Sequence, residues 1–503
     1  MQHIIKTVRE LLLGAMVVAA GSGCSKFLDE TDPSNFTMDN YFTKPAQAQS
    51  AVNAIYQSLI SIPTGDYGGA PWMMLEFPTG LANTEYGQSV DNLNIRNLVN
   101  TAENNHGIQK WTSSYRGIGN ANLAIEKIPG INMDEATKNK LLGEAHFLRA
   151  YFYFDLVRIF GKIPLITGTV TSTSPEIYSP AAAEEDVYKQ IVADLTAAEQ
   201  SGLPWTDAGG RATMGAVKSL LASVYLTMAG YPLQKGSEYF QLAAAKANEV
   251  ITSGKFDLFT SYDDLHSLDK ENTGEHIFMV QFAASNWTTS MDFQKFILPY
   301  TKNISLLNNR TGAIYASDEF VASFETGDKR AKDRQFFYNT YTLTTDRNTT
   351  IALGGNYLYK FFDVQANTVT GTSGLNFPLI RYAEVLLIYA EAANEAGGPT
   401  AAAYEAVNKI RRRAELTELS GLTQGAFREA VWRERYHELC YENKVWFDMV
   451  RLRKVLNITN GTFDAFEGHK FTYGPVLSKR ELLFPIPTVE INNNSNIDQN
   501  PGY

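Results

Sequence analysis

Cysteine is almost absent from this sequence, which contains two among 503 residues. They are Cys24 and Cys440, and if Cys24 is modified, no disulfide can form within the chain. Cys440 stands among Tyr436, Leu439 and Val445, so we predict a small core residue rather than a reactive thiol. The stability of the fold must then come from packing, which a chain of this length can supply.

Histidine is also scarce, at 7 residues, and the common signatures of metal and nucleotide sites are missing. There is no HExxH string, no paired CxxC and no P-loop. Glu434 and His437 form a Glu-x-x-His string, but a di-iron bundle needs two, so a charged helix face is the favoured interpretation. No nucleophile signature is present, and no acidic pair stands out as the two carboxylates of a glycosidase. We therefore expect no metal, no cofactor and no enzymatic activity.

Positive charge is in the minority, with 44 Lys and Arg against 54 Asp and Glu and a formal net charge of −10. A chain of this sign repels phosphate backbones, so we expect no nucleic-acid partner. After Cys24, no apolar run reaches the roughly 20 residues of a transmembrane helix. Hydrophobic residues at 44% and charged residues at 19% are typical of a globular protein with a substantial core.

The N-terminus has the pattern of a secretory signal peptide. Lys6 and Arg9 precede the apolar run Leu11–Ala20, and Gly21-Ser22-Gly23 stands directly before Cys24. This arrangement resembles the lipobox of bacterial lipoproteins, in which the cysteine thiol is acylated, although Gly21 stands where that pattern usually has Leu. Two or more acyl chains would anchor the protein stably to a membrane. The alternative is an ordinary signal peptide followed by an unrelated cysteine.

Helical periodicity dominates residues 45–260 and 381–503. The segments come in pairs joined by short turns, similar to tetratricopeptide-type hairpins, but no strict repeat period survives. Residues 61–105 and 261–380 are instead rich in Gly, Asn, Thr and Ser. The fold class is therefore predicted as mainly α, with degenerate tetratricopeptide-like helical hairpins, an irregular loop-rich region and a few short strands. Helices are predicted at 45–60, 108–128, 134–160, 183–200, 213–229, 237–252, 381–396, 400–414, 423–443 and 445–455, and strands at 277–282, 338–343 and 356–361.

Aromatic residues make up 12% of the chain, and several fall in the loop-rich parts. A flat ring in a loop can stack on the apolar face of a sugar while neighbouring amides bond its hydroxyls. Asn286 and Trp287, which follow a predicted strand, fit this role, although for each candidate alone a buried position is as well supported. Tyr67, Trp72 and Tyr86, in the loop 61–105, complete the set of candidate glycan-binding residues. Trp111, Trp432 and Trp446 lie on helical stripes and are predicted to be core.

Several blocks follow one another in a specific order and cover nearly the whole chain after Cys24. Together they resemble the SusD/RagB family of outer-membrane nutrient-binding lipoproteins. The blocks are Phe27-Leu28-Asp29, the helix Ala46–Leu59, Trp111-x-x-x-Tyr115-x-x-Ile118-x-x-Ala121-Asn122, EAHFLRAYFYF at Glu144–Phe154, RYAEVLLIYAEA at Arg381–Ala392, Glu434–Leu439, WFDMVR at Trp446–Arg451 and LLFPIP at Leu482–Pro487.

The resemblance implies a lipid-anchored outer-membrane protein exposed on the cell surface of a Bacteroidetes-type bacterium. Such proteins bind a polysaccharide or oligosaccharide, cap a SusC-type TonB-dependent transporter and are not enzymes. The matching blocks are scaffold motifs, so no ligand contact is carried over from them. Arg149, Arg381, Glu384 and Asp448 are expected to form buried polar links between helices.

These observations predict one compact SusD-like unit with an N-terminal leader. Residues 1–23 form the lipoprotein signal peptide and 24–44 the lipidated N-terminus and tether; 45–260 form the helical scaffold with the loop 61–105, 261–380 the loop-rich region, and 381–503 the C-terminal helices and an extended tail. Two other functions stay open. One is a surface glycoside hydrolase, and the other is a scaffold that captures peptides or glycopeptides, since arrays of helical hairpins bind proteins readily.

Overall fold

Consecutive helices of the chain pack against one another in a continuous row. The computed structural model describes residues 41–65, 69–85, 89–285, 290–300, 303–307, 310–343, 346 and 348–503. Within it, Lys44–Tyr503 form one compact unit. Its helices are α3 (Pro45–Gln57), α4 (Val90–Arg96), α5 (Asn105–Lys127), α6 (Glu135–Phe160), α7 (Glu184–Glu199), α8 (Met214–Ala229), α9 (Ser237–Thr252), α10 (Asp318–Ala322), α11 (Tyr382–Gly397), α12 (Ala401–Arg413), α13 (Gln424–Glu438), α14 (Val445–Leu452) and α15 (Thr488–Asn493).

The helix boundaries follow local sequence signals. Helix α6 starts where the Asp134 carboxylate accepts a hydrogen bond from the amide of Thr137 at 2.8 Å, and it ends at Gly161, whose φ is +72°. A carboxylate at the N-cap satisfies a free amide, and glycine adopts positive φ without strain. The predicted helices at 134–160, 213–229 and 237–252 are confirmed to within a residue at each end.

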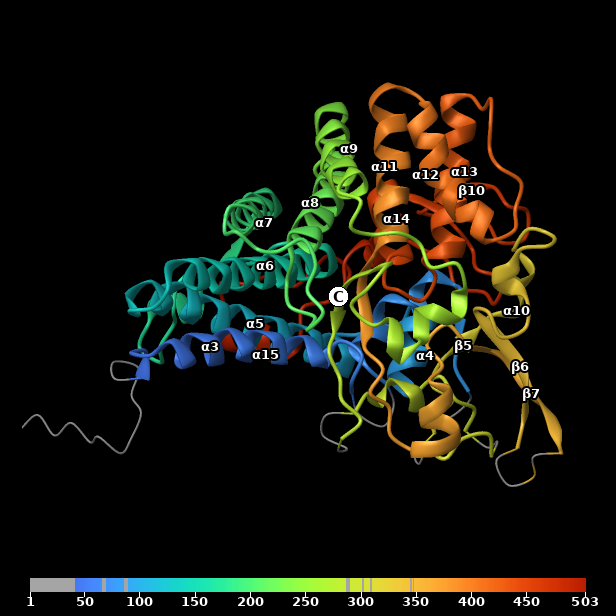
Figure 1. Cartoon of the computed structure of the whole chain (residues 1–503), viewed down its shortest axis with the longest axis horizontal. Helices are drawn as coiled ribbons and strands as arrows, with labels where there is room; N and C mark the ends of the chain where they lie inside the picture. Colours follow the sequence, from blue (N-terminus) through green and yellow to red (C-terminus); the bar gives the residue numbers. More distant parts are fainter. Residues whose placement is uncertain are drawn as a thin grey trace, which may run out of the picture. The chain divides into compact units, whose positions relative to one another are not determined.

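The row runs α3–α5–α6–α7–α8–α9, with each helix packed on the next. Figure 1 shows α3, α5 and α6 lying nearly parallel to one another, with α11, α12 and α13 grouped to one side and steeply inclined to them. Helix α9 packs against α11, although the whole loop-rich segment lies between them in the sequence. The predicted mainly α fold is therefore confirmed, and the loop-rich segment leaves the helical row and returns to it at one place.

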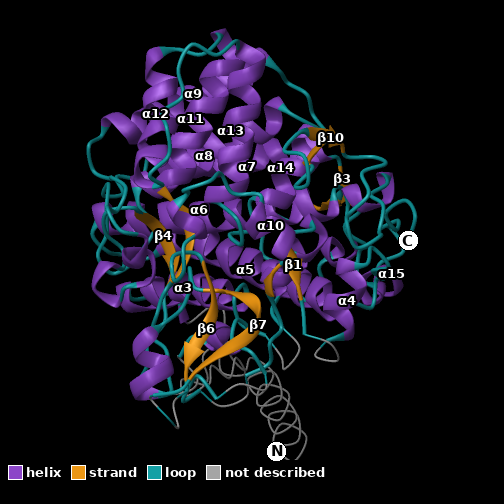
Figure 2. Ribbon diagram, turned by 90° about the vertical axis from the view of Figure 1, so that its right-hand side faces the viewer, coloured by secondary structure: helices purple, strands orange, loops and turns teal. Residues whose placement is uncertain are grey.

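Strands are short and mostly belong to the loop-rich segment, which Figure 2 shows below the group formed by α8, α9, α11, α12 and α13. They form a four-stranded sheet in the order β1-β5-β7-β6 and three two-stranded sheets, β2-β3, β4-β8 and β9-β10. The strands are β1 (Ala82–Asn83), β2 (Ile163–Pro164), β3 (Ala181–Ala182), β4 (His276–Val280), β5 (Tyr315–Ala316), β6 (Phe337–Thr342), β7 (Thr350–Leu358), β8 (Phe377–Arg381), β9 (Lys454–Leu456) and β10 (Phe463–Ala465).

The β4-β8 pair closes the base of the loop-rich segment. The two strands run antiparallel, with His276 opposite Arg381 and Val280 opposite Phe377. All five residues of each strand are buried, which fits their apolar composition. A core rich in tyrosine and phenylalanine, including Tyr338, Tyr357 and Phe362, fills the segment beyond this base.

Two predictions about irregular regions need correction. Residues 61–105 were expected to form one irregular loop, but Pro71–Leu75 and Phe77–Thr79 are short 3₁₀ helices, and every residue from Ala70 to Ala82 is buried. Their side chains are largely apolar, so this stretch is part of the core. The tail was expected to be extended, but Thr488–Asn493 form the helix α15.

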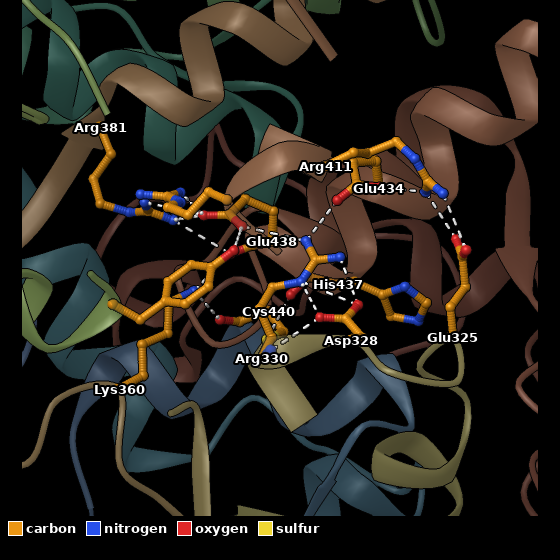
Figure 3. A network of polar contacts seen from close by, with 12 residues as sticks. Glu325, Asp328, Arg330, Lys360, Arg381, Arg411, Glu434, His437, Glu438 and Cys440 are labelled. Atoms are coloured by element: carbon orange, nitrogen blue, oxygen red, sulfur yellow. Dashed lines mark hydrogen bonds and ion pairs between the residues drawn. The ribbon is translucent and has the colours of Figure 1, made fainter. Parts of the chain in front are cut away.

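A buried network of charged side chains joins the loop-rich segment to the C-terminal helices (Figure 3). Arg330 is fully buried, and its guanidinium contacts the Asp328 carboxylate at 2.7 Å. The same guanidinium contacts Glu434 at 2.6 Å and Glu438 at 3.2 Å, both on α13. Buried charges are tolerated only when they are paired in this way. Further members are Glu275, Glu325, Lys360, Arg381, Arg411, Arg413 and Glu442.

Arg381 connects this network to the base of the segment. Its guanidinium contacts Glu442 at 2.6 Å and Glu438 at 3.2 Å, and it also pairs with Glu275, the residue before β4. Burial alone would raise the pKa of Glu438, but Arg413, Arg381 and Arg330 hold it at about 2. Glu438 is therefore charged at any physiological pH.

The other polar links expected between helices are also confirmed. Arg149 on α6 contacts Asp194 on α7 at 2.6 Å, and Glu384 on α11 contacts Lys444 at 2.8 Å. Asp448 on α14 contacts Arg435 on α13 at 2.6 Å. Arg149, Glu384 and Asp448 are all buried, so their charges serve the scaffold.

The cysteine and tryptophan predictions can also be checked. Cys440 is buried and free, and the pKa of its thiol is raised to about 12 by burial, so the prediction of an unreactive core residue is confirmed. Trp111 and Trp446 are 3% and 1% exposed, as predicted for core residues. Trp432 is only half-buried.

Replacing Arg330 by Met should destabilise the fold strongly, because Asp328 and Glu434 lose a buried partner. Breaking a buried pair costs about 3–5 kcal/mol in the free energy of unfolding, which urea denaturation would measure. Lys189→Met is the matched control, since its pair with Asp186 is exposed on both sides and should be worth less than about 1 kcal/mol. Similar losses in the two variants would contradict the role given to the network.

Glu76 is a buried carboxyl group next to the network. It is 1% exposed, and its Oε1 accepts a hydrogen bond from the backbone amide of Asn443 at 2.6 Å. Burial raises the pKa of Glu76 to about 8, although the Asn443 amide and the Lys360 charge oppose this shift. At neutral pH the group is therefore mostly protonated in the folded state.

Glu76→Gln should flatten the pH dependence of stability. The pKa of a Glu in the unfolded chain is about 4.3. Between that pH and about pH 8 only the folded state keeps the proton on Glu76, so the free energy of unfolding falls as pH rises through this range. A pKa difference of one unit is worth about 1.4 kcal/mol. Between pH 5 and pH 8 the free energy of unfolding of the wild type should therefore fall by about 2–4 kcal/mol more than that of the variant. Urea unfolding at both values tests this, and parallel profiles would refute it.

Candidate functional site

The sequence-predicted site residues fall into two groups. Cys24, Tyr67, Tyr86, Asn286 and Trp287 lie outside the described residues, so their roles stay predictions. Trp72 is described, and its side chain is fully buried.

Trp72 lies in an aromatic cluster of the core. The edge of the Phe293 ring meets it with centroids 4.8 Å apart, and Phe361 and Phe377 lie at 6.3 Å. Edge-to-face contacts of this kind are favourable packing. Because the indole has no exposed face, stacking of Trp72 on a sugar is not retained, and Trp72 is assigned to the core.

Glu85, the last described residue before Tyr86, links its own segment to three places in the loop-rich region. Its backbone amide donates to the Gly312 carbonyl at 3.0 Å. Its Oε1 accepts hydrogen bonds from the Tyr300 amide at 2.9 Å and from the Tyr357 hydroxyl at 2.6 Å. The half-buried carboxylate of Glu85 thus ties its own segment to β7 and to the segment that carries Tyr300.

Tyr300 places an aromatic ring at the surface of this region. Its side chain is among the large exposed hydrophobic groups, at 45%. The following loop is held by Arg310, whose Nη1 donates to the carbonyls of Ser305 at 2.9 Å and Leu307 at 3.0 Å. The ring is therefore accessible, while the backbone amide of Tyr300 is held by Glu85.

Tyr315 on β5 is a second, half-buried ring in the same region. Its ring lies so close to Gly355 that a Cβ at that position would come within 2.9 Å of it, so the glycine lets the ring lie against the strand. Tyr315 pairs with Asn83 on β1 in the antiparallel register, which puts both side chains on one face. Its centroid is 5.3 Å from that of Tyr357.

Charged groups surround Tyr315. Burial raises its pKa, Arg96 lowers it, and Glu85 and Asp318 raise it further. Arg96, the last residue of α4, is fixed by a hydrogen bond from Nε to the Ala82 carbonyl at 3.2 Å and lies 3.7 Å above the Tyr473 ring. We name the group Asn83, Glu85, Arg96, Tyr300 and Tyr315 the tyrosine surface.

The tyrosine surface combines two accessible or half-buried rings with an amide, a carboxylate and a guanidinium. This combination can stack on an apolar ring face and hydrogen-bond the hydroxyl groups at its edge. Among the described residues, no group of three or more His, Cys, Asp or Glu side chains could hold a metal ion. The same part of the chain contains no helix long and apolar enough to cross a membrane.

Sequence reasoning missed Tyr300 and Tyr315. Tyr300 follows Pro299 and precedes Thr301 and Lys302, so the rule that selected Trp287, an aromatic residue among loop residues, would have found it. Tyr315 carries no such signal, because its neighbours Ile314 and Ala316 are apolar. Only the pairing of β1 with β5 brings it next to Asn83.

Family models match both halves of the chain. Residues 270–503 match the SusD family, and residues 26–226 match a family described as starch-binding and associating with the outer membrane. The SusD-like protein P2 of Formosa agariphila is 29% identical over 513 residues, which cover 96% of this chain and 97% of that protein.

Solved structures have the same fold. A SusD superfamily protein from Parabacteroides distasonis has 38% sequence identity and a TM-score of 0.87, with 93% of this chain and 100% of that chain covered. Surface glycan-binding protein A from Bacteroides thetaiotaomicron, in complex with laminarihexaose, has 19% identity and a TM-score of 0.72, with 91% and 100% covered. The second likeness shows the fold alone. The first, at 38% identity over the full length of the relative, together with the matches to both halves, shows that this chain belongs to the SusD family.

Proposed function

We propose that this protein is a cell-surface lipoprotein of the outer membrane that captures a glycan and caps a SusC-type TonB-dependent transporter. The observation that carries the proposal is membership of the SusD family over both halves of the chain. The tyrosine surface supports it, because its groups have the chemistry that sugar recognition needs. Anchoring would occur through Cys24, after removal of residues 1–23.

The glycan site is proposed at the tyrosine surface of the loop-rich region. Tyr300 and Tyr315 would supply stacking faces, and Asn83 and Arg96 would bond hydroxyl groups. Tyr86, which directly follows Glu85 in the sequence, stays in the proposed site on the stacking argument. Tyr67, Asn286 and Trp287 stay in the proposed site on the stacking argument alone.

The proposed activity is binding without catalysis. Two carboxylates placed across a cleft would be required for a glycosidase. In the tyrosine surface the carboxylate is Glu85, and its Oε1 already accepts two hydrogen bonds from the protein. Asp318, which also acts on Tyr315, likewise accepts a hydrogen bond from the Asn356 side chain at 2.7 Å. Such a group supports the fold of the site and is poorly placed to donate or abstract a proton. A hydrolase and a peptide-capturing scaffold are the outcomes that the following experiment would expose.

Isothermal titration of the mature protein with a panel of polysaccharides should identify a ligand. Laminarihexaose is a suitable first probe, since a relative of the same fold is solved with it. Tyr300→Ala should weaken binding by about 2- to 10-fold, because one aromatic contact contributes about 0.5–1.5 kcal/mol to the binding free energy. Tyr178→Ala, at a 57% exposed tyrosine elsewhere, is the matched control and should change nothing.

Three results would count against this proposal. Folded protein that binds no glycan in the panel would remove the function, and binding of peptides instead would favour the scaffold alternative. Release of reducing ends from a bound polysaccharide would show a hydrolase. An unchanged affinity of Tyr300→Ala would leave the function standing but would move the site away from the tyrosine surface.

Cys24→Ala should release the protein from the membrane. Without the thiol no acyl chain can be attached, and the anchoring energy of about 0.8 kcal/mol per buried methylene is lost. Fractionation of a Bacteroidetes host should then find the variant outside the membrane pellet. Mass spectrometry of the wild type should find acyl chains on the N-terminal cysteine, and an unmodified Cys24 would refute the anchor.

A further inference from the structure

A cavity of about 310 Å³ lies between α6, α7, α14 and the C-terminal segment. None of the residues that line it belongs to the tyrosine surface. Its wall is mostly apolar, and it is large enough to be a small-molecule site, because such sites start at about 300 Å³. The apolar part of the wall includes Val157, Tyr188, Phe447, Val450, Leu483 and Pro501.

Arg453 is the notable polar group in this wall. It follows α14 directly, with φ of +54°, and is half-buried. Its Nη1 donates to the Val450 carbonyl at 2.6 Å, and its guanidinium carbon lies 4.9 Å from the centroid of the Tyr231 ring. Among the described residues, no carboxylate forms an ion pair with it. A guanidinium has five N–H donors, so most of those of Arg453 have no acceptor in the part of the protein that the structure describes.

The other arginines of the wall differ from Arg453 in this respect. Arg158 contacts Asp155 at 2.7 Å, Arg451 contacts Asp448 at 2.8 Å, and Arg480 contacts Glu481 at 3.1 Å. Their charges are therefore compensated within the protein. The pKa of Arg453 is instead lowered by burial, which outweighs the opposing effects of Tyr231 and Glu184, as expected for a cation that is partly removed from water and has no carboxylate in direct contact among the described residues.

The remaining charged groups of the wall are Glu184 and Lys479. Glu184, the first residue of α7, is half-buried and forms no ion pair with Arg453 among the described residues. Burial raises the pKa of Glu184, with Arg453 and Lys162 opposing the shift. Lys479 is exposed. The wall therefore has a positive excess, and an anion complements it.

We propose that this cavity binds a small organic acid with an apolar body. The carboxylate pairs with the free side of the Arg453 guanidinium, and the body lies against Tyr188, Phe447 and Leu483. A guanidinium binds a carboxylate with two parallel hydrogen bonds, which gives direction as well as energy. A free sugar fits less well, because its hydroxyl groups would meet a wall with few uncommitted polar groups. The site is separate from the proposed glycan site and does not depend on it.

Isothermal titration of the mature protein with 3-phenylpropionate, and with its neutral amide as the matched ligand, tests the charge requirement. The acid should bind at least tenfold more tightly than the amide. Arg453→Gln should weaken binding of the acid at least tenfold and remove the preference, while Arg453→Lys should retain part of it. Lys189→Gln, at an exposed lysine on α7, should behave as the wild type.

Equal affinity for acid and amide, or unchanged binding by Arg453→Gln, would overturn the proposal. So would folded protein that binds none of benzoate, 3-phenylpropionate and decanoate below about 1 mM. If Arg453→Gln does not fold, Val450→Phe tests the cavity instead, since it fills space without altering the guanidinium. It should weaken binding at least tenfold, and unchanged binding would overturn the proposal. Glycan affinity, measured on the same variants, should be unaffected, which separates this test from that of the proposed function.

Discussion

The buried pairing of Arg330, Arg381 and Arg413 with Glu275, Glu434 and Glu438 is the interaction on which the architecture depends. The loop-rich segment has few regular elements, so backbone hydrogen bonding alone could not fix it to the helical row. The network provides this attachment at its base, where β4 and β8 meet α12 and α13. Unpaired charges in such a place would be very costly, so one arrangement of the segment is strongly selected.

This attachment separates the helical scaffold from the loop-rich segment that carries the proposed glycan site. The helical row packs from α3 to α9 and continues into α11, with its polar residues committed to links such as Arg149 to Asp194. The loop-rich segment extends from the place where α9 and α11 meet. An aromatic ring of this segment, such as that of Tyr300, can be exposed to solvent because the core of the segment is packed without it.

The same division bears on the proposed function, which is binding without catalysis. Glu76 and Glu438, two strongly perturbed titratable groups, are buried among scaffold residues, where no substrate can reach them. The tyrosine surface offers rings and hydrogen-bonding groups without an uncommitted acid. In the cavity beside Arg453, one guanidinium nitrogen donates to the Val450 carbonyl and no described carboxylate pairs with the group, which makes the cavity a second place to look for a ligand.

Sequence patterns were enough to predict the long helices, their pairing and the family, because apolar spacing, capping residues and ordered motif blocks are local signals. The short helices α4, α10 and α15 were missed. The sequence also placed Arg149, Arg381, Glu384 and Asp448 in the scaffold. It could not decide the fate of Trp72, since an aromatic residue among Gly and Pro has the same local pattern in a surface loop and in a buried 3₁₀ turn. Only the tertiary structure made that choice, through the packing of Phe293, Phe361 and Phe377. It alone also brought Asn83 beside Tyr315 and placed Arg453 in the wall of a cavity, because these arrangements join residues that are distant in the chain.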